Sequence, residues 1–249
     1  ATVTPDHEFP GSACFLQAKM DIPGIPAIDV RQQCGGFIYA LSMADQYIRT
    51  GTYKNVLVIG AEVQTTQLDF DNEGRGTAII FGDGAGAVLL EPNNDGLGIQ
   101  DSVLQSDGSG SAFLHMKAGG SLKHASHKTI DAREHFVFQD GQPVFKSAVK
   151  NMADVSEEIM KRNNLSADDV AWLVPHQANT RIISAMAKKL DMPIENVVVT
   201  VGQHGNTSAA SIPLALDVGI NDGRIKDNDI LLLPAFGGGF TWGSVLLQY

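Results

Sequence analysis

The sequence predicts an α/β fold in which one structural unit occurs twice. Each unit has a chemically versatile residue at the start of an amphipathic helix, then an apolar strand and a glycine-rich strand pair. The spacing repeats as well, because Lys54 lies twenty residues after Cys34 and Lys226 lies twenty residues after Asn206. With 249 residues and 43% hydrophobic content, the chain can build one large core or two closely packed halves.

The first unit surrounds Cys34. Residues 29–33 are predicted to end a strand, Cys34 to start a helix, and Gly51 to stop it. The apolar positions that recur with helical spacing are Phe37, Ile38, Leu41, Ala44 and Ile48. An apolar strand over residues 56–60 and a glycine-rich strand pair that includes residues 81–90 complete the unit.

The second unit surrounds Asn206. It is predicted to contain a strand over 197–201, a helix from Asn206 to residue 220, and a strand over 230–234. Residues 230–247 carry no charge and are long enough for a membrane helix, but Pro234 and the glycines at 237–239 interrupt them. Two buried strands around a glycine turn explain this stretch better.

The connecting segments also have readable patterns. A helix is predicted over 144–163, a strand over 170–175 that leads to His176, and a helix over 180–190. We therefore divide the chain into a first half over 1–97, a connecting region over 98–140 and a second half over 141–249. Residues 1–5 resemble the end of a strand, and the chain does not begin with methionine, so we expect an upstream segment to be absent from this numbering.

Composition and local context exclude several functions. A formal charge of −10 argues against a nucleic-acid or anionic-membrane surface. Two cysteines cannot form a disulfide framework, and they suit a reducing cytoplasm. His124 and His127 have no cysteine or acidic ligand at a fitting spacing, so we expect no metal site. The glycine-rich residues 81–87 contain Asp83, which would repel phosphate, and they read as a strand bend.

Three residues with acyl-transfer chemistry occupy junctions between elements. A helix N-terminus favours a thiolate, so the pKa of Cys34 is expected to be low, and Gly35 and Gly36 leave room for an acyl group. Taken singly, a buried cysteine, a core histidine and a helix-capping asparagine are ordinary, and Cys14 is expected to be structural. The joint placement of Cys34, His176 and Asn206 instead predicts a thioester-handling site, and the duplication predicts that Cys34 lies near Asn206.

Several longer motifs then identify a family. They are Cys-Gly-Gly-Phe-Ile-Tyr-Ala-Leu, Phe-Gly-Asp-Gly-Ala-Gly-Ala, Val-Pro-His-Gln-Ala-Asn-Thr-Arg-Ile-Ile, Gly-Asn-Thr-Ser-Ala-Ala-Ser-Ile-Pro and Phe-Gly-Gly-Gly-Phe-Thr-Trp-Gly-Ser. The chain resembles β-ketoacyl-acyl carrier protein synthase III, the thiolase-fold ketosynthase that starts bacterial fatty-acid synthesis. The resemblance runs from the first residues to the last and implies a thiolase-like, duplicated αβαβα layered fold with an incomplete N-terminal half.

The resemblance also has departures. The family has an additional N-terminal segment, with the first strands and some residues for the coenzyme A adenine. The family usually has serine or alanine where this chain has Gly35, and the polar stretch 108–140 looks longer than usual. None of these departures touches Cys34, His176 or Asn206.

The resemblance implies roles for individual residues. Cys34 would accept an acyl group from acyl-coenzyme A, and its backbone N–H would form an oxyanion hole with that of Gly238. His176 and Asn206 would bind the malonyl thioester carbonyl and stabilise the enolate formed by decarboxylation. Coenzyme A contacts are implied for Arg75, Gly141, Phe145 and Asn179.

Partners follow from the same resemblance. Arg181, Lys188 and Lys189 match a docking patch for acyl carrier protein, an acidic partner that suits a local basic surface. Without the resemblance, a solvated helix face explains these three residues. A homodimer is implied through the strand after Val56, with Phe9 lining the partner's acyl pocket. No tightly bound cofactor is expected, since acyl-coenzyme A is a substrate.

Two other functions fit parts of the pattern. A papain-like thiol hydrolase also has Cys, His and Asn in this order at comparable spacing, but no Cys-Gly-Ser-Cys-Trp motif surrounds Cys34. Alternatively, the chain is an inactive, truncated binding fragment. Acetyl-coenzyme A distinguishes the three, because a synthase would acylate and condense, a hydrolase would release acid, and a fragment would do neither.

Overall fold

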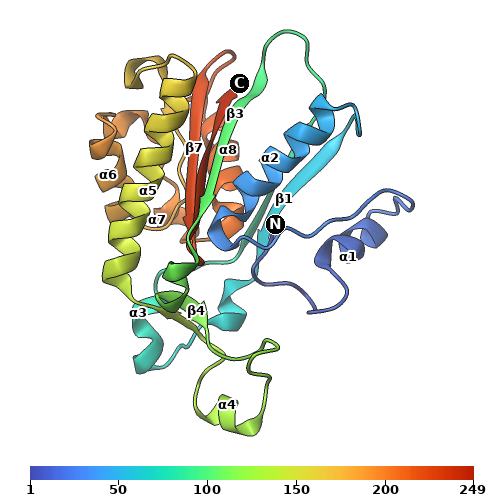
Figure 1. The fold of residues 1–249 in the computed structure, drawn as a ribbon, viewed down its shortest axis with the longest axis vertical. Coiled ribbons are helices and arrows are strands. Elements are labelled where there is room, and N and C mark those ends of the chain that lie inside the picture. Colours follow the sequence, from blue (N-terminus) through green and yellow to red (C-terminus); the bar gives the residue numbers. More distant parts are fainter.

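A computed structural model describes all residues 1–249 and contains three β-sheets, of four, two and two strands, together with the helices that pack around them (Figure 1). The helices are α1 Ser12–Lys19, α2 Gly36–Arg49, α3 Arg75–Ala78, α4 His127–Asp131, α5 Gly141–Arg162, α6 Thr180–Lys189, α7 Val201–His204 and α8 Ser211–Asn221. The strands are β1 Val56–Glu62, β2 Gly84–Leu90, β3 Gly98–Ser106, β4 Leu114–Met116, β5 Val137–Gln139, β6 Trp172–Leu173, β7 Ile230–Gly237 and β8 Thr241–Gln248. No helix has both the length and the apolar character needed to cross a membrane.

The two predicted units are both present. In each, a single 3₁₀ turn precedes a helix, and the helix leads to an antiparallel pair: α2 to β1–β2 and α8 to β7–β8. Gly51 and Gly223 adopt positive φ angles of 70° and 77° just after the two helices, which is the conformation of a glycine helix stop. The larger sheet has the order β3-β8-β7-β6, in which only β6 runs parallel to its neighbour β7.

Strand β7 explains how the layers are held together. Leu231, Leu233 and Ala235 share a buried cluster with side chains of α2 and α8, while Leu232 and Phe236 share another with α5 and α6. Successive strand residues point to opposite faces, so one continuous apolar strand packs against helices on both sides. Figure 1 shows α5 and α6 on one side of this sheet and α2 with β1 on the other.

Some expected elements are absent or shifted. Residues 29–33 form no strand, because no neighbouring strand of this chain pairs with them. Residues 197–201 make a single parallel bridge, between Val197 and Leu173, before α7 begins. Strand β6 is only two residues long, and Pro175, which has no backbone N–H, follows within the expected range.

The connecting region begins with a strand of the larger sheet. Strand β3 pairs along its length with β8, so residues 98–106 form an edge strand of the C-terminal sheet. The remainder holds the short β4–β5 pair and α4, at the lower end of Figure 1. Arg133 of this segment forms an ion pair with Asp69, which ties the segment to the loop before α3.

Candidate active site

Cys34 lies in a tight turn that the surrounding chain packs closely. Gln33, just before it, has a φ of 45°, a conformation that side chains adopt mainly at strained, functional positions. A Cβ on Gly237 would lie 2.7 Å from the Cys34 nitrogen, so only glycine fits at this point of β7. Cys34 therefore lies in the 3₁₀ turn 33–35, which leads directly into α2 at Gly36.

The thiol of Cys34 contacts the second unit. The Ser208 hydroxyl donates a hydrogen bond to the Cys34 sulfur at 3.3 Å, although the two residues are 174 positions apart. Burial raises the pKa of Cys34 to about 11, while the Ser208 hydroxyl acts in the opposite direction. The expected low pKa is therefore wrong for this structure, because the loss of hydration outweighs the helix N-terminus.

His176 is held by contacts on two sides. Its backbone N–H donates to the Pro234 carbonyl at 2.8 Å, which attaches it to β7. Its ring Nδ1 lies 2.7 Å from the Ser211 Oγ, and the Gln177 backbone N–H donates to that same oxygen. Since the Ser211 hydroxyl hydrogen has no acceptor other than Nδ1, it donates there and the ring carries its proton on Nε2.

Burial gives the imidazole a second property. His176 is only 2% exposed, and burial lowers its pKa to about 4. The ring is therefore neutral near neutral pH. The only hydrogen bond of the ring within the protein is the one at Nδ1, so the Nε2–H is free to donate to a ligand.

Asn206 is fixed through its backbone and its side-chain oxygen. Its N–H donates to the Ile80 carbonyl at 2.9 Å, and its own carbonyl accepts from Gly82 at 3.0 Å, so the residue is anchored beside β2. Its Oδ1 accepts the Ser208 N–H at 2.9 Å and so caps the turn that precedes α8. The Nδ2 group makes no protein hydrogen bond and is left as a donor.

A cavity of about 310 Å³ adjoins Cys34, and only some of the predicted catalytic residues line it. Cys34 and Gly238 line it, together with Ser208. His176 and Asn206 do not line it, although Ser208 connects the Asn206 carboxamide to the cysteine sulfur. The complete lining is Val3, Arg31, Gln33, Cys34, Gln64, Gln67, Phe81, Ser111, Leu114, His115, Met116, Val137, Ser208, Gly238 and Gly239.

A buried carboxylate, Glu62, holds the turn next to the Cys34 site in place. Glu62, at the end of β1, is 3% exposed and accepts hydrogen bonds from the backbone N–H groups of Val3, Thr4 and Ala209. The hydroxyls of Thr2 and Thr4 also donate to it. Burial raises the pKa of Glu62, and these hydrogen bonds oppose that change. Through Ala209, the carboxylate holds the turn that carries Ser208.

The residues matched to coenzyme A binding lie on three helices and their ends, and none of them lines the cavity beside Cys34. Arg75 is exposed at the start of α3, and Gly141, the first residue of α5, lines a separate cavity with Asp69 and Arg133. The Arg181 guanidinium lies over the Phe145 ring, with its central carbon 5.9 Å from the centre of that ring. The Asn179 Oδ1 accepts the Ile182 N–H at 2.9 Å and caps α6.

The other predicted residues are on the surface. Arg181 and Lys188 are exposed on α6, whereas Lys189 forms an ion pair with Asp154 of α5 at 2.5 Å. Lys189 is therefore less available to a partner than the other two. Phe9 is 88% exposed.

Four residues of the site went unnoticed in the sequence. Ser208 and Ser211 lie within the Gly-Asn-Thr-Ser-Ala-Ala-Ser motif, which was the available signal. Glu62 and Gln64 carried none, because an acidic residue and a glutamine near the end of a strand are usually solvated.

Comparisons with known proteins agree with this geometry. The sequence model described as 3-Oxoacyl-[acyl-carrier-protein (ACP)] synthase III matches residues 28–108, and the one described as its C terminal matches residues 160–249. Beta-ketoacyl-[acyl-carrier-protein] synthase III of Koribacter versatilis is 47% identical over 250 residues, covering 100% of this chain and 74% of the relative. The protein of the same name from Xanthomonas campestris is 49% identical over 248 residues, with coverage of 100% and 74%.

Solved structures show the same similarity in three dimensions. The 3-oxoacyl-[acyl-carrier-protein] synthase III from Aquifex aeolicus superposes with a TM-score of 0.89 at 41% identity, covering 100% of this chain and 75% of that one. The synthase III from Pseudomonas aeruginosa gives a TM-score of 0.91 at 36% identity, with the same coverage. The thiolase-like, duplicated layered fold is thereby confirmed.

Proposed function

The chain belongs to the β-ketoacyl-[acyl-carrier-protein] synthase III family, the condensing enzymes that initiate fatty-acid synthesis, and we propose that Cys34, His176 and Asn206 perform its two half-reactions. It is accordingly an acyltransferase. The observation that supports this assignment best is the linked pair of hydrogen bonds that connects Asn206 to Ser208 and Ser208 to the Cys34 sulfur.

In the first half-reaction, acyl-coenzyme A transfers its acyl group to Cys34. The sulfur–carbon bond to Cys34 forms, the thioester bond to coenzyme A breaks, and the Cys34 proton leaves with the coenzyme A thiol. Ser208 donates to the sulfur and so stabilises the developing thiolate. The backbone N–H groups of Cys34 and Gly238 hold the carbonyl oxygen as it becomes negative.

In the second half-reaction, malonyl-acyl carrier protein loses carbon dioxide. The electrons of the broken carbon–carbon bond form an enolate, whose oxygen accepts from His176 Nε2–H and Asn206 Nδ2–H. The enolate carbon then attacks the acyl-Cys34 thioester, and the carbon–sulfur bond to Cys34 breaks. This gives 3-oxoacyl-acyl carrier protein and the Cys34 thiolate, which takes up a proton from water to restore the thiol. Both donors are oriented before substrate arrives, because Ser211 fixes one ring nitrogen and the Ser208 N–H fixes the amide oxygen.

Substrate entry and assembly complete the proposal. Arg75, Gly141, Phe145 and Asn179 guide coenzyme A or pantetheine, and acyl carrier protein docks on Arg181 and Lys188, with a smaller part for Lys189. The enzyme works as a homodimer in which Phe9 reaches the partner's acyl pocket, which its 88% exposure supports. No tightly bound cofactor is required. Two free cysteines suit a cytoplasmic location.

The experiment separates the half-reactions. Intact mass after acetyl-coenzyme A treatment should show one acetyl group, which peptide mapping places on Cys34 and Cys34→Ala removes. His176→Ala and Asn206→Ala should keep this acetylation while losing condensation with malonyl-acyl carrier protein by about a hundredfold to a thousandfold. Acetylation at Cys14, steady release of acetate without condensation, or unchanged condensation by either alanine variant would overturn the assignment.

A further inference from the structure

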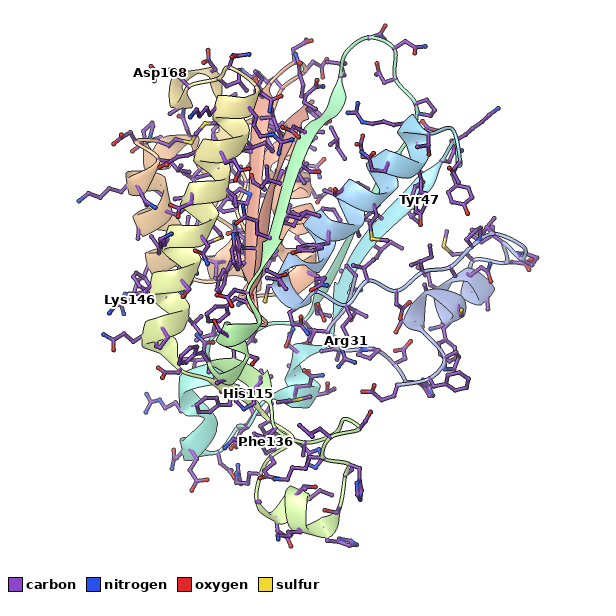
Figure 2. The ribbon with its side chains drawn as sticks, in the orientation of Figure 1. Arg31, Tyr47, His115, Phe136, Lys146 and Asp168 are labelled. Atoms are coloured by element: carbon purple, nitrogen blue, oxygen red, sulfur yellow. The ribbon has the colours of Figure 1, made fainter.

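The cavity beside Cys34 is unusually polar for a site that receives an acyl chain. Only six of its fifteen lining residues are hydrophobic, whereas pockets for apolar groups are lined mainly by hydrophobic side chains. Three glutamines contribute to its wall: Gln33, Gln64 and Gln67. Arg31 and His115, which Figure 2 labels below the centre of the view, are two further members of this wall although they are far apart in sequence.

Gln64 has unused hydrogen-bonding capacity. It is only 2% exposed, it lines this cavity, and its carboxamide makes no hydrogen bond within the protein. Gln177 is a useful contrast, because it is 1% exposed and fully engaged. Its Nε2 donates to the Pro175 and Val198 carbonyls, and its Oε1 accepts from Thr200 and Val201. The carboxamide of Gln64 is not among the fully buried unpartnered groups, so it opens onto the cavity with its donors and acceptor free for a ligand.

His115 lines the same cavity with its ring, which packs against Phe138 with centroids 5.3 Å apart. Its Nδ1 is buried without a hydrogen-bond partner and does not open onto the cavity. Gln64 begins the turn after β1 and His115 belongs to β4, so separate segments form this part of the wall. Arg31 differs from both, because its guanidinium is largely exposed and lies 3.6 Å from Glu8.

We propose that the acyl group accepted by Cys34 carries a neutral hydrogen-bonding substituent, a hydroxyl or carbonyl oxygen, that binds the carboxamide of Gln64. This rests on the proposed acyl transfer to Cys34. The substituent takes no part in the bonds made and broken, and it selects among acyl-coenzyme A substrates. A site with buried polar groups rejects an analogue that lacks the matching group, since its own groups then remain unpaired. The uncharged carboxamide of Gln64 favours a neutral substituent over a carboxylate.

Matched substrate pairs test this with the unmodified full chain. In 3-hydroxybutyryl- and 3-methylbutyryl-coenzyme A, a hydroxyl replaces a methyl group of similar size, and 4-hydroxybutyryl- and pentanoyl-coenzyme A give the same comparison one carbon further. The rate of Cys34 acylation by each is measured by intact mass. We expect the hydroxylated member of at least one pair to react about tenfold faster or more.

A variant then assigns the selectivity. Gln64→Leu has a similar volume without the carboxamide, so it should remove most of the preference for the hydroxylated member of the pair. Gln46→Leu, the same change at an exposed position of α2, serves as the control and should keep the preference for the hydroxylated substrate. If the alkyl member of both pairs reacts as fast as the hydroxylated member or faster, the inference about the substituent is wrong. Acetyl transfer to Cys34 in the same experiment would still support the proposed function. Failure of every acyl-coenzyme A to modify Cys34 would overturn both.

Discussion

The Ser208 hydroxyl lies 3.3 Å from the Cys34 sulfur and joins the two halves of the molecule at the reacting atom. Ser208 also has a φ of 49°, so the contact is held by a strained backbone that Glu62 supports through the neighbouring Ala209 N–H. The cysteine is thus positioned by residues of the second unit, and its reactivity depends on how both halves pack.

The first prediction concerns that reactivity. Because burial raises the pKa of Cys34 to about 11, its alkylation by iodoacetamide should accelerate about tenfold per pH unit from pH 7 to 10 without reaching a plateau. Mass spectrometry with peptide mapping separates Cys34 from the exposed Cys14. A plateau near neutral pH would show a stabilised thiolate and contradict the effect of burial.

The second prediction concerns Ser211, which positions His176. Ser211→Ala removes the donor to Nδ1, so the imidazole proton is no longer confined to Nε2. Condensation should fall about tenfold, while acetylation of Cys34 stays within about twofold. Long-range ¹⁵N NMR of the His176 ring should show the loss of the Nε2–H tautomer. Equal loss of both half-reactions with an unchanged tautomer would indicate a purely structural role.

Glu62 gives a third prediction. In Glu62→Gln, an amide NH₂ replaces one oxygen that accepts hydrogen bonds from the residue 2–4 segment or Ala209. The free energy of unfolding measured in urea should fall by about 2 kcal/mol, and Cys34 acylation should slow because Ser208 loses support. Glu157→Gln, at an exposed position of α5, is the matched control. An unfolding curve identical to that of the control would count against this support.

Charge reversal on α6 gives a fourth prediction. Arg181→Glu should raise the KM for malonyl-acyl carrier protein, and high salt should reduce the difference from wild type, because salt already screens the ion pairs. Acetylation by acetyl-coenzyme A should barely change. Lys226→Glu alters the net charge equally at another exposed position, and Lys189→Gln tests a lysine already engaged by Asp154. Equal damage to both half-reactions by Arg181→Glu would rule out docking.

The fifth prediction concerns acid stability. The pKa of His176 is lowered from 6.5 to about 4, so between these values the unfolded chain binds a proton that the folded chain does not. Acidification through this window therefore favours unfolding, and the contribution of His176 is about 3 kcal/mol. Urea unfolding at pH 7 and pH 4 should show a smaller pH dependence for His176→Gln than for wild type. An equal dependence in both proteins would refute it.

Local sequence patterns were sufficient for much of the fold. The apolar periodicity of α2, the glycine stops at Gly51 and Gly223, and the uncharged stretch 230–247 led to the observed helices and hairpin, since each signal lies within one element. The strands expected at 29–33 and 197–201 failed, because strand formation needs a paired neighbour that the sequence of the segment does not reveal.

The family, the two-unit architecture and the junction positions of Cys34, His176 and Asn206 could be predicted without a structure, because they depend on residue types at fixed local spacings. The pKa values and hydrogen-bonding states of these side chains could not. Burial raises the pKa of Cys34 against the expected helix effect, Ser211 sets the His176 tautomer, and the carboxamide of Gln64 is left unpaired beside the cysteine. Hydration and hydrogen-bond partners are properties of groups brought together from distant parts of the chain, so no local pattern encodes them.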